Sequence, residues 1–217
     1  MRISSICAAL LCTSLMLHAQ VPATWVPGNG ETPSHDYDLI HQQIELRDIN
    51  WDSPSLDGRV VTTLAARRAG LDSVILDAAS GIAIATATDA AGRALRTTHA
   101  GDTLVVHLAK PLRFGDTTRF TLGYHARIDN GHGLTFIDAD GRPHRPQQLW
   151  SMGETRGNSA WFPTYEYPND KETWEITATV PSKMTVVSNG RLVSDVRNRS
   201  GSHTTHWRQE QPSATYL

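Results

Sequence analysis

Cysteine is almost absent from this sequence, which has two in 217 residues, Cys7 and Cys12. Both lie in an apolar N-terminal stretch, so the rest of the chain can form no disulfide, no cysteine-based metal site and no thiol nucleophile. Positive charge is also scarce, because 20 Lys and Arg are set against 22 Asp and Glu, a net charge of −2. This balance argues against a nucleic-acid-binding protein.

A long hydrophobic run occurs only at the N-terminus. Arg2 precedes an apolar stretch over 3–17, and Ala19 is a small residue at a suitable cleavage position. These features predict a signal peptide over 1–19, which is too short to span a bilayer; a buried N-terminal helix is the alternative. We therefore expect a secreted or periplasmic protein, cleaved near Ala19, without a membrane span.

The rest of the chain divides into an arm and a β-rich domain. Residues 20–35 are rich in Pro and Gly and predict an extended arm or linker. From 36 to 217, short runs of alternating apolar and polar residues are separated by turn residues, which predicts an all-β sandwich or barrel. The expected strands cover 37–46 with a bulge near Gln42, 60–66, 71–76, 104–108, 120–126, 134–137, 147–152, 174–180, 184–187, 192–196 and 204–208. A hairpin turn is expected at 188–190.

Familiar catalytic motifs are missing from the sequence. None of the ten His begins the His-Glu-x-x-His pattern of zinc peptidases, and neither Gly-x-Ser-x-Gly nor Gly-x-x-x-x-Gly-Lys occurs. The pair His203 and His206 has a different spacing, and on a strand the two side chains would face opposite sides. We therefore predict no metal site and no catalytic residue within this chain.

The segment over 150–174 is unusual in composition. It holds three of the six Trp, together with two Tyr, one Phe, Pro163 and Pro168. Aromatic residues among Gly, Ser and Asn predict a well-packed irregular loop whose backbone angles are fixed by the prolines. A corner between two sheets, filled by aromatic side chains, is the purely structural interpretation.

This segment resembles a known family. The run Trp-Phe-Pro-Thr-Tyr-Glu-Tyr-Pro-Asn-Asp-Lys over 161–171 is similar to the Trp-Phe-Pro-Cys-Phe-Asp-Glu-Pro-x-x-Lys segment of zinc aminopeptidases of the aminopeptidase N and leukotriene hydrolase type. Met152-Gly-Glu154 stands where that family has a Gln-Gly-Glu-like motif. The stretches 71–78, 176–181 and 187–192 are also similar, so the resemblance covers about 36–217.

The resemblance implies a saddle-like, multi-stranded β domain that packs on a separate catalytic domain. In that family the zinc belongs to the catalytic domain, so this chain is expected to need no cofactor of its own. Glu154 maps to the carboxylate that pairs with the α-ammonium group of the peptide substrate, although a solvated loop carboxylate is the alternative. The loop residues expected to be structural are Trp161, Pro163, Glu166, Pro168 and Lys171.

Two functions follow as hypotheses. The first is the non-catalytic N-terminal domain of an exported zinc aminopeptidase, which shapes the rim of the substrate cleft and lacks its catalytic domain in this chain. The second is a stand-alone secreted β-sandwich that binds a peptide or glycan through the aromatic loop.

Overall fold

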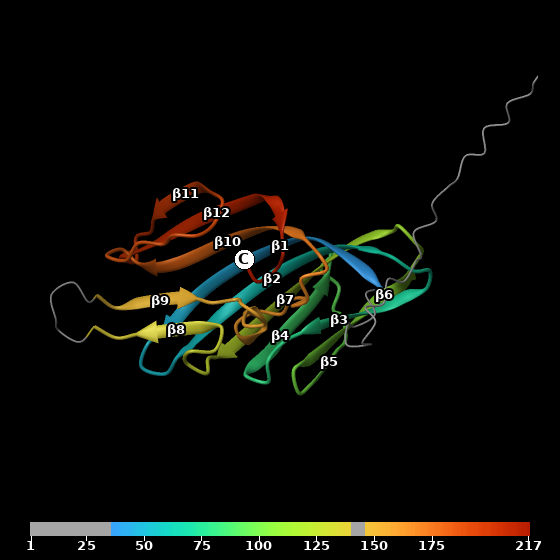
Figure 1. Ribbon diagram of the computed structural model, residues 1–217, viewed down its shortest axis with the longest axis horizontal. Helices are drawn as coiled ribbons and strands as arrows, with labels where there is room; N and C mark the ends of the chain where they lie inside the picture. The colour runs from blue at the N-terminus through green and yellow to red at the C-terminus, as the bar shows by residue number, and fades with distance from the viewer. Residues whose placement is uncertain (1–35, 140–145) are drawn as a thin grey trace, which may run out of the picture. The chain divides into compact units, whose positions relative to one another are not determined.

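The computed structural model describes residues 36–139 and 146–217, and the regular secondary structure of this part is almost entirely β-strand (Figure 1). The predicted signal peptide and arm, over 1–19 and 20–35, lie outside the described residues. The strands are β1 (Tyr37–Asn50), β2 (Ser55–Ala66), β3 (Leu71–Asp77), β4 (Ile82–Asp89), β5 (Thr97–Ala100), β6 (Thr103–Leu112), β7 (Thr117–Arg127), β8 (Leu134–Ile137), β9 (Gln148–Ser151), β10 (Glu172–Pro181), β11 (Arg191–Arg197) and β12 (Ser202–Ser213). One 3₁₀ turn, η1 (Asn158–Ala160), interrupts the long loop between β9 and β10.

Three sheets form from these strands. The large sheet has seven strands in the order β11-β12-β10-β1-β2-β7-β4, and the smaller ones are β3-β6-β5 and the hairpin β8-β9. Strands β1 and β10 pair in parallel, and the other pairs are antiparallel. The expectation of an all-β, multi-stranded sheet domain is confirmed. No helix among the described residues has the length and apolar character needed to cross a membrane.

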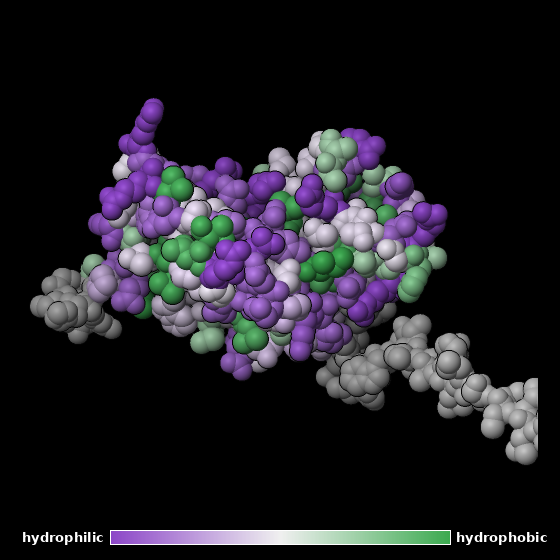
Figure 2. All heavy atoms as spheres, turned by 90° about the horizontal axis from the view of Figure 1, so that it is seen from above, coloured by the Kyte–Doolittle hydropathy of each residue, from purple (hydrophilic) through white to green (hydrophobic). Residues whose placement is uncertain are grey.

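The core lies between the large sheet and the β3-β6-β5 sheet. Alternate residues of the two sheets, such as Leu64 and Leu122 on one side and Val74 and Leu104 on the other, are completely buried in one cluster. This follows from the period of two in strand side chains, which places every second residue on the inner face. The face of the molecule in Figure 2 is mostly hydrophilic, with small, separate hydrophobic groups.

Two predictions about the C-terminal strands are wrong. Residues 184–187 form no strand, because the Met184 N–H donates to the Pro181 carbonyl (2.9 Å) and turns the chain at the end of β10. The turn over 188–190 therefore joins no hairpin. The hairpin joins β11 to β12 and is closed by the Asn198 N–H on the Ser202 carbonyl (2.8 Å).

Three smaller differences between the predicted and the observed strands concern the N-terminal half. The irregularity expected near Gln42 is a register shift between Leu39 and His41. Strands β4 and β5 were not predicted. Strand β4 has its own register shift between Ile84 and Thr86, and this breaks the alternation by which a strand is recognised in sequence.

Candidate functional site

Glu154 lies on a short loop between β9 and η1. Its side chain is exposed, and no hydrogen bond or ion pair joins it to another residue that the structure describes. Gly153 and Gly157, on either side, are buried, and the Gly157 N–H donates to the Gly153 carbonyl (2.9 Å), which closes the loop. The peptide bond between Glu154 and Thr155 is cis. The loop therefore presents a free carboxylate to solvent on a backbone fixed at both ends.

The C-terminal residues pack on this loop. A Cβ atom on Gly153 would lie 2.6 Å from the Tyr216 carbonyl oxygen and 2.9 Å from the Tyr216 Cα, so only glycine fits there. The Asn158 amide Nδ2 donates to the Thr215 carbonyl, and its Oδ1 accepts from the Trp161 indole (3.1 Å). Asn158 thus joins the Glu154 loop, the aromatic segment and the end of the chain.

Arg156 provides a third attachment of the loop. Its Nη2 donates to Asp77 Oδ1 (3.2 Å) at the end of β3, and its guanidinium carbon lies 5.8 Å from the centroid of the Tyr167 ring. A guanidinium over an aromatic face is attracted by the π electrons. The side chain of Arg156 is 58% exposed, so solvent weakens both contacts.

We expect Arg156→Met to lower the free energy of unfolding only slightly, by about 0.5–1 kcal/mol. Methionine keeps the aliphatic stem but loses the charge that pairs with Asp77. Urea denaturation measures the change, and Arg119→Met is the matched control, because Arg119 is an exposed strand residue outside this loop. A loss as small for Arg156→Met as for the control would show that the contacts add no stability.

The aromatic segment connects the seven-stranded sheet to the β3-β6-β5 sheet. The Asp77 N–H donates to the Thr164 carbonyl (2.7 Å), and the Thr164 N–H donates to the Asp77 carbonyl (3.0 Å). On the other side, completely buried Gln42 of β1 donates to the Pro163 carbonyl (3.2 Å) and accepts from the Thr164 hydroxyl (2.7 Å). Trp161 of the same segment is buried.

Glu166 is an unusual buried carboxylate in the aromatic segment. It is 1% exposed, its Oε1 accepts from the Ser159 N–H (2.5 Å), and its Oε2 has no partner among the described residues. Burial raises the pKa of Glu166 to about 7, the Ser159 N–H opposes that rise, and the nearby Asp77 charge adds to it. Its own backbone N–H donates to Asp77 Oδ2 (2.9 Å). Glu166 therefore anchors the loop from within the protein interior.

The remaining predicted loop residues differ in their surroundings. Pro163 is buried against Gln42, whereas Pro168 and Lys171 are exposed. The anchor at this end is Asp170, which no sequence pattern marked as a structural residue. Its buried carboxylate accepts from the Leu39 N–H of β1 (2.7 Å).

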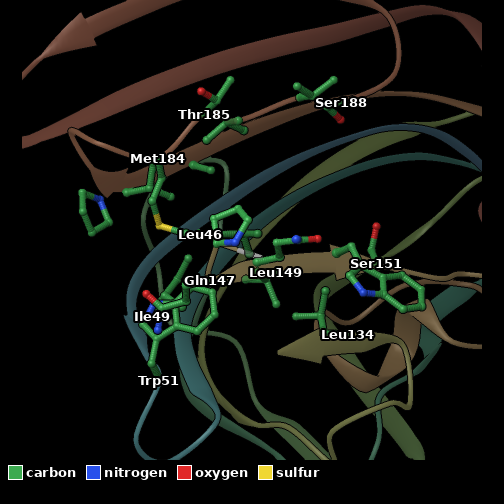
Figure 3. Close-up of a pocket in the computed structure, with 18 of the residues that line it drawn as sticks. Leu46, Ile49, Trp51, Leu134, Gln147, Leu149, Ser151, Met184, Thr185 and Ser188 are labelled. Atoms are coloured by element: carbon green, nitrogen blue, oxygen red, sulfur yellow. The ribbon is translucent and has the colours of Figure 1, made fainter. Parts of the chain in front are cut away.

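An apolar groove of about 1160 Å³ adjoins the Glu154 loop (Figure 3). Leu46 and Ile49 of β1 face Leu134 and Leu149 of the β8-β9 hairpin across it, and Met184 reaches in from the segment after β10. Its lining continues along β9 to Ser151, directly before the Glu154 loop.

The opposite face of the large sheet carries a charged cluster around Glu175. Glu175 accepts from His206 Nε2 (2.8 Å) and lies near His41 Nε2 (3.5 Å) and Arg208 Nε (3.4 Å). Burial lowers the pKa of His41, and the Glu175 charge offsets part of that effect. The Arg208 guanidinium opposes a bound cation. Across 36–139 and 146–217, no group of three or more His, Cys, Asp or Glu is placed to hold a metal ion.

The two His of the C-terminal pair face opposite sides of β12, as predicted. His206 lies in the Glu175 cluster, and His203 is buried on the other face, where its Nδ1 contacts Asp195 Oδ1 (2.6 Å). They cannot share one metal ion.

The comparisons with known proteins decide the family. The model of the peptidase M1 N-terminal domain matches residues 34–217. The chain belongs to the peptidase M1 N-terminal domain family. No curated protein gives a significant match.

Solved structures agree with this family. The M1 zinc metallopeptidase from Deinococcus radiodurans is 26% identical, with a TM-score of 0.71, over 84% of this chain and 41% of that chain. A mutant of that enzyme bound to a Tyr-Ser-Ala substrate gives a TM-score of 0.70 at 26% identity, with the same coverages of 84% and 41%. A two-domain M1 zinc metallopeptidase mutant bound to L-tryptophan matches with 26% identity and a TM-score of 0.70, over 84% of this chain and 41% of that one. This M1 domain thus spans less than half the length of these relatives.

Proposed function

We propose that this chain is the non-catalytic N-terminal domain of an exported zinc aminopeptidase, in which it shapes the rim of the substrate cleft. The observation that carries the proposal is the placement of Glu154, which is exposed, has no partner in 36–139 or 146–217, and lies on a loop that is fixed on several sides. A carboxylate so placed can accept a charge-assisted hydrogen bond from the α-ammonium group of a peptide.

The path of the chain supports a position at the cleft. Thr215 and Tyr216 pack against the Glu154 loop, so a catalytic domain that continues from Leu217 would begin beside Glu154. A carboxylate at such a junction gains strength when the second domain excludes water, because the local dielectric constant falls. The loop attachments through Asn158 and Arg156 would keep the carboxylate in place during substrate binding.

The described residues do not fit a zinc ion, since they offer no suitable group of ligands. In the proposal, the zinc is held by the catalytic domain, and no step of the chemistry runs through this chain. The apolar leader over 1–19 supports export to the periplasm or beyond the cell.

The genomic reading frame beyond codon 217 tests the proposal most directly. We expect it to continue into a Gly-x-Met-Glu-Asn loop and a His-Glu-x-x-His motif, the parts that the aminopeptidase family has in its catalytic domain. A terminator at that position in a well-assembled locus would instead favour the stand-alone peptide- or glycan-binding module, for which the apolar groove offers a binding surface.

The purified chain gives a second test. We expect no aminopeptidase turnover and less than stoichiometric zinc, because the described residues offer no set of ligands with an open position. Metal analysis and a fluorogenic aminoacyl substrate measure the two properties. One tightly held zinc ion per chain would contradict the proposal.

A further inference from the structure

A second cavity, of about 410 Å³, lies over β11 and β12 and is separate from the Glu154 loop. Its floor is formed by His203, Thr205 and Trp207, which alternate along β12 and therefore share one face. Ser182 and residues 184–187 complete the lining, with Met184 and Val186 among them. The volume lies at the lower end of the range found for small-molecule sites.

His203 presents an unsatisfied nitrogen in this cavity. The residue is 7% exposed, and its Nδ1 is 2.6 Å from Asp195 Oδ1 on the neighbouring strand. Its Nε2, on the other side of the ring, is buried and has no hydrogen-bond partner among the described residues. A carboxylate on Nδ1 fixes the ring orientation, so Nε2 points away from Asp195, and in an imidazolium ring this nitrogen is a donor.

Two other donors that line the same cavity have no partner among the residues that the structure describes. The Trp207 indole Nε1 is buried and unpaired in the described part of the chain, and an indole N–H can only donate. Arg197 makes no ion pair with any described residue and is the cross-strand neighbour of His203. The ionisable residues of the lining are Asp195, Arg197 and His203. The Asp195 carboxylate already contacts His203 Nδ1.

We propose that this cavity binds a small carboxylate, with the carboxylate group between His203 and Arg197 and a neighbouring carbonyl oxygen on the Trp207 indole. Only acceptor atoms satisfy a guanidinium, an indole N–H and an imidazolium together. The side chains of Met184, Val186 and Leu192 would surround an aliphatic part of the ligand. The C-terminal end of a short apolar peptide has all three features.

Residues 184–187 line the cavity together with β12. The backbone of residues 185–188 makes no hydrogen bond to another residue within the described ranges, so this segment can shift at little cost. It follows that the ligand enters by displacing residues 185–188 rather than by opening the sheet.

Calorimetric titration of the purified chain tests the proposal. The probes are N-acetyl-alanyl-valine, the same dipeptide as its C-terminal amide, isovalerate and inorganic phosphate. We expect the dipeptide acid to bind more tightly than isovalerate, because only the peptide offers a carbonyl to Trp207, and the amide and phosphate to bind weakly or not at all.

Arg197→Gln is the decisive variant, since Arg197 is an exposed residue whose replacement leaves the core intact. We expect its affinity for the dipeptide acid to fall about tenfold to a hundredfold, while the control Arg199→Gln, in the adjacent turn, binds like the wild type. A loss equal to that of the control, equal binding of acid and amide, preferential binding of phosphate, or no binding of any probe would each overturn the proposal. Because the test needs no catalytic domain, its failure would leave the proposed function untouched.

Discussion

Replacing Glu166 by Gln should stabilise the domain at neutral and alkaline pH and have much less effect in acid. The reason is the buried carboxyl, whose pKa of about 7 lies above the ordinary value of 4.5. A rise of that size corresponds to about 3 kcal/mol of pH-dependent stability. The measurement is urea denaturation of both proteins at several values between about pH 4.5 and about pH 8.

The sign of this pH effect on stability follows from the number of protons that Glu166 binds in the folded and in the unfolded chain. Between its unfolded and folded pKa values, Glu166 binds more protons in the folded chain than in the unfolded chain, so the stability it contributes is present in acid and is lost as pH rises through 7. Gln keeps an oxygen to accept the Ser159 N–H and cannot ionise. The difference in unfolding free energy between variant and wild type should therefore increase by about 3 kcal/mol from acid to neutral pH, then level off.

Glu154→Gln is the matched control for this effect. The same chemical change on an exposed carboxylate of the same loop should leave the pH profile of stability unchanged. Glu172, whose pKa burial also raises, contributes to the wild type and to both variants alike, so it cancels in the comparison. Parallel curves for wild type and Glu166→Gln would show that Glu166 is ionised in the folded domain.

The strands were predictable wherever apolar residues alternate without interruption. Leu104, Val106 and their neighbours in β6 fit that pattern, and so do the strands over 120–126 and 174–180. Strand β5 lacks apolar residues at alternate positions. Residues 184–187 have the alternation but pair with no strand in the described part of the chain. A sequence pattern reports which residues can be buried on one face, whereas strand formation also requires a partner for the backbone.

The residues that hold the Glu154 loop and the aromatic segment in place were less predictable from the sequence than the position of the candidate site. The family motif points to Glu154 and to the buried aromatic segment, but nothing near Gln42, Asp77 or Asn158 in sequence marks them as anchors. Gln42 contacts Thr164 across 122 residues, and Asp77 contacts Arg156 across 79. Such contacts arise only when distant strands meet, so they are invisible to local patterns of periodicity or turn residues.

In the intact enzyme proposed above, Glu154→Gln should reduce kcat/KM about tenfold to a hundredfold for peptides with a free N-terminus. Gln preserves the shape of the side chain and removes the charge that would pair with the α-ammonium group. A partly buried, charge-assisted hydrogen bond contributes about 1.5–3 kcal/mol, which sets the size of the loss. Steady-state kinetics with one aminoacyl substrate over a range of concentrations measures it.

The structure separates this loss from an effect on folding. Glu154 is exposed and has no partner among the described residues, so its neutralisation should change the unfolding free energy of the isolated chain by less than about 0.5 kcal/mol. Glu45→Gln, on the outer face of β1 and away from the loop, is the kinetic control and should behave as the wild type. Equal kcat/KM for the wild type and Glu154→Gln would assign Glu154 to the solvated loop surface.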